Sequence, residues 1–420
     1  MNQLKLPEFK ILKIEENSQG DLKFTVEAVE PQKICPECYS TDCYKHACIE
    51  RFARDLNLFD QRVGVKVRGH RYKCKQCGNT FTQQFESIDE RDKITLRLRE
   101  KIKELSLKEP FAKIADDFSL SPTTVKRIFN EFVEQNNKSM IFQTPTILGI
   151  DEVHLNKQMR AVFTDIENLK ILDILADRNK KTVTNFLENV PKKQKIKVVV
   201  SDIWQPYKDA AKTALPAAKL VIDKFHVIRY GNKALDTIRK SFKDTLTKKQ
   251  RIKLKNGRLI LLKNKEELDA REVIKRDSWF AYFPILEKAY FLKEGLRDIY
   301  NCKTKDQAIS CYNQWKLSIP KDMKEFQELS AIIDNWHEEI FNYFDFFATN
   351  AYTESINNII KHIERIGRGY SFDVLRAKVL FGSRATIKPK YKNYDEDYSR
   401  IGHVMSKTVE HVSLQIPSIN

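Results

Sequence analysis

The stretch TILGIDEVHLNKQMRAVFTDIENLKILDILA, residues 146–176, holds three apolar runs separated by short polar segments. The runs cover residues 146–155, 160–166 and 170–176. Runs of this length that are rich in Ile, Leu and Val are typical of β-strands, and connections this short favour antiparallel pairing. The stretch therefore predicts a three-stranded antiparallel sheet.

After this sheet the sequence alternates between helical and strand patterns. We expect a helix at 180–190, a strand at 196–201, a helix at 206–215 and a strand at 219–222. The run of three valines at 198–200 indicates a strand that is covered on both faces. Three antiparallel strands followed by alternating helices and strands is the order of an RNase H-like α/β sandwich. We therefore predict a multi-domain α/β protein built around an RNase H-like core.

Two acidic residues interrupt the apolar runs of this core. Asp151 ends the run 147–150, and Asp202 ends the run 198–201. Burying a carboxylate is costly unless it is paired or bound to a metal ion. The two residues are therefore candidate metal ligands, although a solvated Asp that caps a strand would explain either one alone.

A third acid, Glu354, lies in a predicted helix whose apolar stripe contains five isoleucines between residues 356 and 366. At about 100° per residue, the face opposite that stripe carries Glu354, Asn358, Lys361 and Arg365. Carboxylate oxygens suit Mg²⁺ or Mn²⁺, and a pair of such ions can activate the attacking oxygen and stabilise the leaving oxygen in phosphodiester chemistry. We expect Asp151, Asp202 and Glu354 to hold these ions and the two cations to contact DNA phosphates. A solvated helix face is the alternative.

Other residues near these acids compete for a role. Glu152 adjoins Asp151 and should point to the opposite face of the strand, which makes it the poorer ligand. Asp223 and His226 could line the site, although an Asp that follows a strand and caps the next helix explains them equally well. The aromatic residues at 204 and 207 could stack on DNA, but we expect them to belong to the core.

Six of the eight cysteines precede residue 80, and four of them form two C-x-x-C pairs. The pairs are Cys35 with Cys38 and Cys74 with Cys77, separated by 35 residues. Four thiolates in two such pairs can close a tetrahedral zinc site, so we expect a structural Zn²⁺ in a small β module. Other residues that could replace a ligand are Cys43, His46, Cys48 and His70. Buried thiols without a metal ion are the alternative.

From residue 90 to about 135 the apolar period becomes helical, and 111–118 and 122–132 have a helix-turn-helix outline. Ser121 is a natural N-cap, and the proline that follows it suits the first helical position. The exposed start of the second helix carries Thr123, Thr124, Lys126 and Arg127, the place from which a recognition helix reads base edges. We predict DNA binding there, with ordinary helix packing as the alternative.

The charge balance agrees with a polyanionic partner. The 420 residues contain 74 Lys plus Arg against 57 Asp plus Glu, which gives a net charge of +17, and residues 229–276 alone contain 16 basic and 6 acidic residues. This favours nucleic acid over a neutral partner. The chain has no apolar run of about 18 residues and no apolar segment at its start, so we expect an intracellular, cytoplasmic protein that does not enter membranes and associates with the nucleoid when bound to DNA.

These patterns divide the chain into six segments. We predict a zinc-binding module at 1–88, a helix-turn-helix module at 89–140, the first part of the RNase H-like core at 141–225, an all-α basic insertion at 226–345, the final core helices at 346–387 and a C-terminal tail at 388–420. A chain of this size and 41% apolar content excludes wholesale disorder and a single miniature domain.

The order of the motifs resembles that of insertion-sequence transposases with a DDE active site, specifically the ISL-three family. Besides the cysteine pairs and the helix-turn-helix, the matching motifs are GIDE (149–152), SDIWQPY (201–207), DKFHV (223–227), TESINN (353–358) and IERIGRGY (363–370). The resemblance implies that Asp151, Asp202 and Glu354 form the metal-binding triad. It also implies that the helical segment between Asp202 and Glu354 is an insertion in the catalytic fold.

The resemblance implies a DNA transposase that binds the terminal inverted repeats of its own element, cleaves the DNA there and joins the freed end to target DNA. Coordinating two ends implies at least a homodimer. Two other functions fit some of the same residues: a non-catalytic DNA-binding regulator derived from a transposase, and a metal-dependent nuclease without strand transfer.

Overall fold

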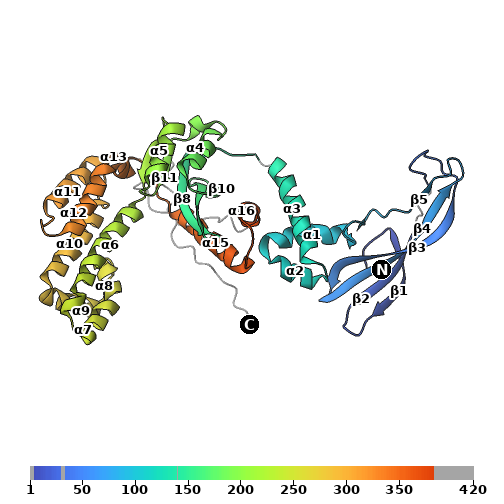
Figure 1. Cartoon of the computed structure of the whole chain (residues 1–420), viewed down its shortest axis with the longest axis horizontal. Coiled ribbons are helices and arrows are strands. Elements are labelled where there is room, and N and C mark those ends of the chain that lie inside the picture. Colours follow the sequence, from blue (N-terminus) through green and yellow to red (C-terminus); the bar gives the residue numbers. More distant parts are fainter. Residues whose placement is uncertain (1–3, 30–33, 140, 383–420) are drawn as a thin grey trace. The chain divides into compact units, whose positions relative to one another are not determined.

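The computed structural model describes residues 4–29, 34–139 and 141–382, so the predicted tail at 388–420 lies outside the described residues. The described chain divides into two compact units (Figure 1). Unit 1 contains the residues up to 141 together with 366–368 and 377–382, and unit 2 contains 142–365 and 369–376. No helix in the described part is long and apolar enough to span a bilayer.

Unit 1 begins with a mixed sheet in which the strands run in the order β1-β2-β4-β3-β7-β6, with β5 added to β4. Its strands are β1 (Phe9–Glu16), β2 (Leu22–Ala28), β3 (Cys43–Leu58), β4 (Gln61–Cys74), β5 (Thr80–Thr82), β6 (Ile88–Asp89) and β7 (Ile94–Thr95). The long antiparallel hairpin of β3 and β4 dominates the sheet. Val63, Val65 and Val67 alternate with more exposed residues and are fully buried, because a strand turns every second side chain to the same face.

Three helices complete unit 1: α1 (Leu96–Lys108), α2 (Phe111–Asp117) and α3 (Pro122–Ser139). The predicted helix-turn-helix outline is confirmed, and Ser121 caps α3 by accepting a hydrogen bond from the backbone N–H of Thr124 at 3.1 Å. The helical pattern expected from residue 90 begins only at Leu96. Ile94 lies instead in β7, which pairs with β3, and the side chain of Thr95 then caps α1.

Unit 2 is built around a sheet of strand order β10-β9-β8-β11-β12. The strands are β8 (Ile147–Leu155), β9 (Gln158–Asp165), β10 (Lys170–Ile174), β11 (Val198–Ser201) and β12 (Lys219–Ile222), and α4 (Lys180–Glu188) and α5 (Gln205–Ala214) lie between them in the chain. The first three strands pair antiparallel, and β11 pairs parallel with both β8 and β12. The predicted three-stranded antiparallel sheet is therefore confirmed, as is the alternation of helices and strands after it.

Between β12 and residue 346 the described chain is helical (Figure 1). The helices are α6 (Lys224–Ser241), α7 (Lys248–Asn256), α8 (Arg258–Leu262), α9 (Ala270–Tyr282), α10 (Pro284–Ile299), α11 (Lys305–Leu317), α12 (Lys324–Asn335), α13 (His337–Phe341) and α14 (Tyr343–Phe346). Buried aromatic residues such as Tyr290, Tyr312 and Phe326 join the apolar cluster that also contains the sheet residues of unit 2. The helices and the sheet thus share one continuous core.

The last two helices are α15 (Ala351–Gly367) and α16 (Phe372–Phe381). The start of α15 approaches β8 closely at Gly149: a Cβ atom there would lie 2.5 to 2.8 Å from side-chain oxygens of Thr164, Thr353 and Asn350. The amide of Asn350 donates to the carbonyl of Ile150 at 2.8 Å. Only glycine permits this contact, so Gly149 places α15 beside the sheet.

Candidate active site

The register of the unit 2 sheet brings Asp151 and Asp202 together. Val200 of β11 pairs with Gly149 of β8, so the two acids each lie two residues beyond a paired position on neighbouring parallel strands. Residues two apart on a strand share a face, which places both carboxylates on the same side. Asp151 does not lie at the end of a strand, as the stop of the apolar run at residue 150 suggested, because β8 continues to Leu155, the end of the longer predicted run 146–155, through its antiparallel pairing with β9.

His226 joins the two acids. Its Nε2 atom lies 2.7 Å from Oδ1 of Asp202, an ion-pair contact, and that buried oxygen accepts no hydrogen bond of good geometry among the described residues. Ligand atoms of Asp151, Asp202 and His226 all lie within 4.8 Å of one another, and the three residues are buried. We predicted His226 as a neighbour of the acidic site, but in the structure its side chain lies among the ligand atoms themselves.

The buried carboxylate of Asp151 is held from two directions. The backbone N–H of Glu152 donates to Oδ1 at 2.7 Å, and the side-chain amide of Asn357 donates to Oδ2 at 2.8 Å. Burial, followed by repulsion from Asp202, raises the pKa of Asp151 to about 7. Sequence reasoning missed Asn357, although its position three residues after Glu354 on the same helix was a signal that it lies near the acids.

Glu354 belongs to a second group of ligand atoms. Asp223, His226 and Glu354 lie within 4.8 Å of one another, and Oε1 of Glu354 is 4.0 Å from Nε2 of His226. The three predicted acids therefore do not form a single group; two groups meet at His226. The Glu354 side chain is 47% exposed, so this second group opens to solvent.

Asp223 serves both of the roles considered for it. It is fully buried, and its carboxylate accepts hydrogen bonds from the backbone N–H groups of Phe225 and Asn350, each at 3.1 Å. It thus caps α6 and also links that helix to the segment before α15. Burial raises its pKa to about 6.

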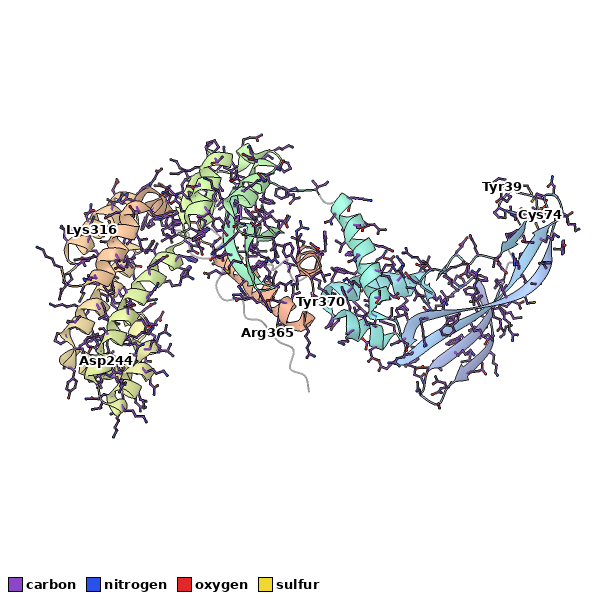
Figure 2. All side chains as sticks on the ribbon, in the orientation of Figure 1. Tyr39, Cys74, Asp244, Lys316, Arg365 and Tyr370 are labelled. Atoms are coloured by element: carbon purple, nitrogen blue, oxygen red, sulfur yellow. The ribbon has the colours of Figure 1, made fainter. Side chains whose placement is uncertain are left out.

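The exposed face of α15 carries the predicted cations. Lys361 and Arg365 are exposed together with Glu354 and Asn358, while Ile356 and Ile360 are buried on the other side. Figure 2 shows Arg365 near the end of this helix. The expected division of the helix into an apolar and a polar face is therefore confirmed.

Three residues near the acids in the sequence, Glu152, Trp204 and Tyr207, have different surroundings in the structure. Glu152 forms an ion pair with Arg178, which withdraws it from the acid groups as expected. Tyr207 is fully buried in the core. Trp204 is not a core residue: it is 37% exposed, and the guanidinium of Arg178 lies 4.4 Å from its ring centroid.

The four predicted zinc ligands come together in unit 1. Sγ of Cys35 lies 3.6 Å from that of Cys77, Sγ of Cys38 lies 3.5 Å from that of Cys74, and all four sulfur atoms lie within 4.8 Å. Both C-x-x-C turns have the same form: the backbone N–H of the first cysteine donates to the carbonyl five residues later, and the residue after the second cysteine has a positive φ. Backbone N–H groups, that of Cys77 first, lower the pKa of Cys74 to about 6 and so favour its thiolate. Figure 2 shows Cys74 and Tyr39 close together at one end of the β3–β4 hairpin.

Some of the four side chains predicted to contact DNA in the helix-turn-helix already interact with other residues of the protein. Thr123 and Lys126 are exposed at the start of α3, while the Thr124 hydroxyl lies 2.9 Å from that of Ser121. Arg127 forms an ion pair with the buried Asp92 and remains 30% exposed. Sequence periodicity could not reveal this pair, because Asp92 precedes α1.

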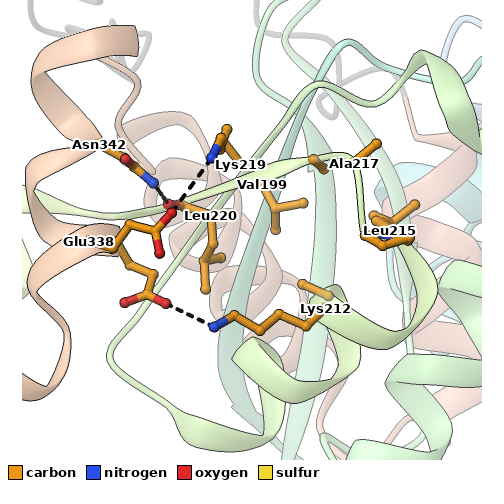
Figure 3. A pocket seen from close by; sticks show the side chains of 12 residues that line it. Val199, Lys212, Leu215, Ala217, Lys219, Leu220, Glu338 and Asn342 are labelled. Atoms are coloured by element: carbon orange, nitrogen blue, oxygen red, sulfur yellow. Dashed lines mark hydrogen bonds and ion pairs between the residues drawn. The ribbon is translucent and has the colours of Figure 1, made fainter.

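A small cavity of about 260 Å³ lies elsewhere in unit 2 (Figure 3). It is lined by α5, the start of β12 and residues of α13, including Lys212, Lys219 and Glu338. Lys219 and Glu338 form an ion pair at 3.6 Å, and the amide of Asn342 donates to the carbonyl of Leu220. The acid groups follow the carboxyl ends of β11 and β12, so the cavity is not part of the candidate site.

Comparison with known proteins places these features in a family. A family model described as a transposase, of the ISL3 type, matches residues 148–379, and the helix-turn-helix domain of transposase family ISL3 matches residues 83–133. The chain is 25% identical over 345 residues to the transposase for insertion sequence element IS1001 of Bordetella parapertussis, covering 80% of this chain and 85% of that protein.

A second relative is the transposase for insertion sequence element IS1557 of Mycobacterium tuberculosis, 25% identical over 282 residues. That match covers 59% of this chain and 62% of the relative. The transposase model itself spans more than half of the chain, from β8 to α16, and includes both groups of acids. The chain therefore belongs to the ISL3 family of transposases.

Proposed function

We propose that this transposase binds the terminal inverted repeats of its own insertion sequence, cleaves the DNA at those ends and joins the freed strands to target DNA. The observation that carries the proposal is the convergence of Asp151, Asp202 and Glu354 around His226. These residues come from β8, the end of β11, α15 and α6, which are distant in the sequence. Three acids and a histidine gathered from four elements beside an exposed basic helix face are suited to phosphodiester chemistry.

We further propose that the sheet of unit 2 is an RNase H-like core and that the helices from α6 to α14 are an insertion within it. The strand order, three antiparallel strands followed by two parallel ones, supports this assignment. On this basis we retain the segment boundaries predicted above: 1–88, 89–140, 141–225, 226–345, 346–387 and 388–420.

The acid groups fit divalent cations. The buried Oδ1 of Asp202 has Nε2 of His226 2.7 Å away but accepts no hydrogen bond of good geometry among the described residues. Burial, followed by repulsion from Asp202, raises the pKa of Asp151. A cation between them would remove this repulsion. We propose that Asp151, Asp202 and Glu354 hold Mg²⁺ or Mn²⁺, with Asp223 and His226 at the site. When bound, the ions would activate the attacking oxygen and stabilise the leaving oxygen.

The protein groups would then hold the DNA for two successive displacements. Water first attacks the phosphodiester at the end of the element, and the broken bond leaves a 3′-hydroxyl. That hydroxyl next attacks a phosphodiester of the target and displaces a target 3′-oxygen, so that no protein nucleophile is needed. Lys361 and Arg365, on the exposed face of α15, would contact the flanking phosphates.

DNA recognition is assigned to two surfaces. In unit 1, Thr123, Thr124 and Lys126 at the start of α3 would contact base edges and backbone, and the exposed part of Arg127 would reach a phosphate. In unit 2, five exposed cations of α7 form no ion pair within the described residues: Lys248, Lys249, Arg251, Lys253 and Lys255. Such a helix would add sequence-independent phosphate contacts.

The cysteine cluster is proposed to hold a structural Zn²⁺. Its sulfur atoms already lie within tetrahedral reach of one another, and thiolates are the preferred ligands of structural zinc. The ion would hold the two turns together at the open end of the β3–β4 hairpin, where β3 begins and β4 ends. Because two ends must be cleaved and joined to one target, we also propose that the active form is at least a homodimer.

Cleavage and joining of labelled DNA from the element's own ends tests the proposed function. With Mg²⁺ or Mn²⁺, we expect nicked and joined products from the intact protein and a loss of at least about a thousandfold in Asp151→Asn, Asp202→Asn and Glu354→Gln. Asp209→Asn, which removes a carboxylate of α5 outside the acid groups, is the matched control and should retain activity.

The outcome separates the three functions. Joined products that disappear in all three variants, with end binding intact, support the transposase. Cleavage without joining would favour a nuclease, and binding without any product under either metal would favour a DNA-binding regulator. Activity that survives Asp202→Asn would contradict the assignment of the site.

A further inference from the structure

Two exposed aromatic side chains occupy equivalent places beside the acid groups. Trp204 follows Asp202 by two residues, and Phe225 follows Asp223 by two residues. The strands before them, β11 and β12, are parallel and in register, with Ser201 opposite Ile222. Each aromatic residue therefore lies just beyond the carboxyl end of its strand, where the acids gather.

Both rings remain in contact with solvent. Trp204 is 37% exposed and Phe225 is 46% exposed, whereas Tyr207 and Val227, which follow them in the chain, are buried. Exposed aromatic rings of this size lose the free energy that burial would provide. Their shared position next to the acids points to a ligand that covers them during the reaction.

Each ring also has a cation near it that the fold holds in place. The guanidinium of Arg178 lies 4.4 Å from the Trp204 centroid and is paired with Glu152, the neighbour of Asp151. The ammonium of Lys224 lies 5.5 Å from the Phe225 centroid and donates to the hydroxyl of Tyr343 at 3.1 Å. An aromatic ring with an adjacent cation suits a nucleotide, because the ring stacks on the base and the cation attracts the phosphate.

Base pairing decides which nucleotides these rings can contact. Bases inside a duplex are already stacked on their neighbours, so a protein ring gains contact only with a base that is unpaired or at an end. Before metal ions bind, the acids repel the phosphates of DNA. Attraction between the protein and the DNA strand near the acids must therefore come from other groups. The two aromatic and cation pairs supply it.

We propose that Trp204 and Phe225 stack on unpaired bases next to the phosphate that is held at the acid groups. The inference rests on the proposed function, since it names the DNA conformation that the same site takes. It assigns both residues a positioning role: they hold a melted or single-stranded end in place, and the acids act on the bond beside it.

Binding of two DNA probes in buffer that contains neither Mg²⁺ nor Mn²⁺ and no chelator, where we expect no cleavage and the structural zinc stays in place, tests the inference. One probe is a blunt duplex of about 30 base pairs, and the other is the same duplex with a short 3′ overhang that contains 2-aminopurine. We expect the intact protein to bind the overhang probe more tightly and to quench its fluorescence. Trp204→Ala or Phe225→Ala should each weaken overhang binding by roughly five- to 150-fold, the range for loss of one stacked base, while blunt binding stays the same.

Three further variants control for folding and for exposed aromatic residues in general. Trp204→Phe should keep most of the preference because it keeps a ring, and Trp204→Leu should lose it although it keeps an apolar side chain. Tyr282→Ala removes another exposed ring of unit 2, in α9, and should leave both probes unaffected.

Three results would overturn the inference. They are equal binding of the two probes by the intact protein, an unchanged overhang preference in Trp204→Leu and Phe225→Ala, and an equal loss of blunt and overhang binding in those variants. Because these measurements involve no cleavage, the proposed function can fail in the Asp202→Asn assay independently of this result.

Discussion

The two units each hold a cluster of ligand-type side chains, and the clusters are built in opposite ways. In unit 1, four thiols come from two short turns with the same hydrogen-bond pattern, at one end of a single hairpin. In unit 2, the carboxylates and the imidazole come from separate strands and helices that meet only in the folded core. The first cluster depends on local geometry and the second on strand register.

This difference implies different consequences when an ion is removed. The turns of unit 1 extend beyond the apolar cluster of its sheet, which contains Val63 and Val65 but none of the four cysteines. The acids of unit 2, in contrast, are carried by strands whose apolar residues form a large buried core. We therefore expect the zinc site to stabilise its own surroundings and the acid site to remain folded without its ions.

The largest effect is expected from breaking the thiol cluster. Structural zinc contributes on the order of 10 kcal/mol in small zinc-binding peptides, so Cys35→Ser should release the ion and unfold the turns around it. Metal analysis should find one zinc per intact chain and much less in the variant. Hydrogen exchange should show lost protection at residues 34–43 and 74–80, while the core of unit 2 stays protected.

Cys48→Ser is the matched control, because Cys48 lies on β3 in the same module, outside the group of four. It should keep both the zinc and the protection. An unchanged zinc content in Cys35→Ser would contradict the assignment and would remove the contrast between the two clusters.

A smaller effect on stability is expected when a change of pH titrates the acid groups of unit 2. The folded-state pKa of Asp151 is raised to about 7, above its usual value of about 4. The folded state therefore holds a proton that the unfolded state has lost, so stability without metal should fall as pH rises from about 4 to 7. The share of Asp151 in this slope is roughly 1.4 kcal/mol per pH unit at most. Thermal unfolding at pH 5 and 7.5 should show this fall, and Mg²⁺ should reverse it at the higher pH.

Asp151→Asn should reduce the slope and remove most of the Mg²⁺ response, leaving the shares of Asp223 and His226, whose pKa values are also raised. Asp209→Asn should retain both the slope of stability against pH and the response to Mg²⁺. If Asp151→Asn kept the full slope, the two buried carboxylates would not oppose each other, and the acid cluster would resemble an ordinary set of solvated side chains.

The smallest effect per substituted residue is expected for DNA affinity when the basic residues of α7 are replaced. Replacing Lys248, Lys249 and Arg251 by Gln should lower the slope of log affinity against log salt by about 0.9 for each lost phosphate contact. Lys263→Gln removes a cation that is already paired with Glu272 at 2.7 Å, and it should change the slope much less. Equal changes per removed charge in the two variants would show that net charge, and not this helix, attracts the DNA.

Much of the fold could be predicted because it depends on local patterns. The strands of unit 2 were expected within two residues of their observed ends, since continuous or alternating apolar runs mark buried strands. The helix-turn-helix followed from an apolar stripe and a Ser-Pro start. The continuous apolar run stops before Asp151, which suggested a strand end there, but pairing with β9 carries the strand to Leu155, as the longer run 146–155 predicted.

The candidate site was predicted less completely because its contacts are not local. Asn357 and Arg178 were missed, His226 was placed at the edge of the site and not at its centre, and Trp204 was assigned to the core. Each of these depends on which residues of distant elements face one another. A shift of one residue in strand register would turn every side chain to the other face, and no local pattern determines that register.

By itself, the sequence determined the order of the strands and helices in the core of unit 2, the two cysteine turns and the polar face of α15. These features follow from spacing along one segment, where the geometry of a turn, strand or helix leaves few choices. Only the tertiary structure decided that two groups of ligands meet at His226, that Arg127 is paired with Asp92 and that Trp204 and Phe225 remain exposed beside the acids. The physical reason is that burial and charge pairing depend on what the rest of the chain places against a residue.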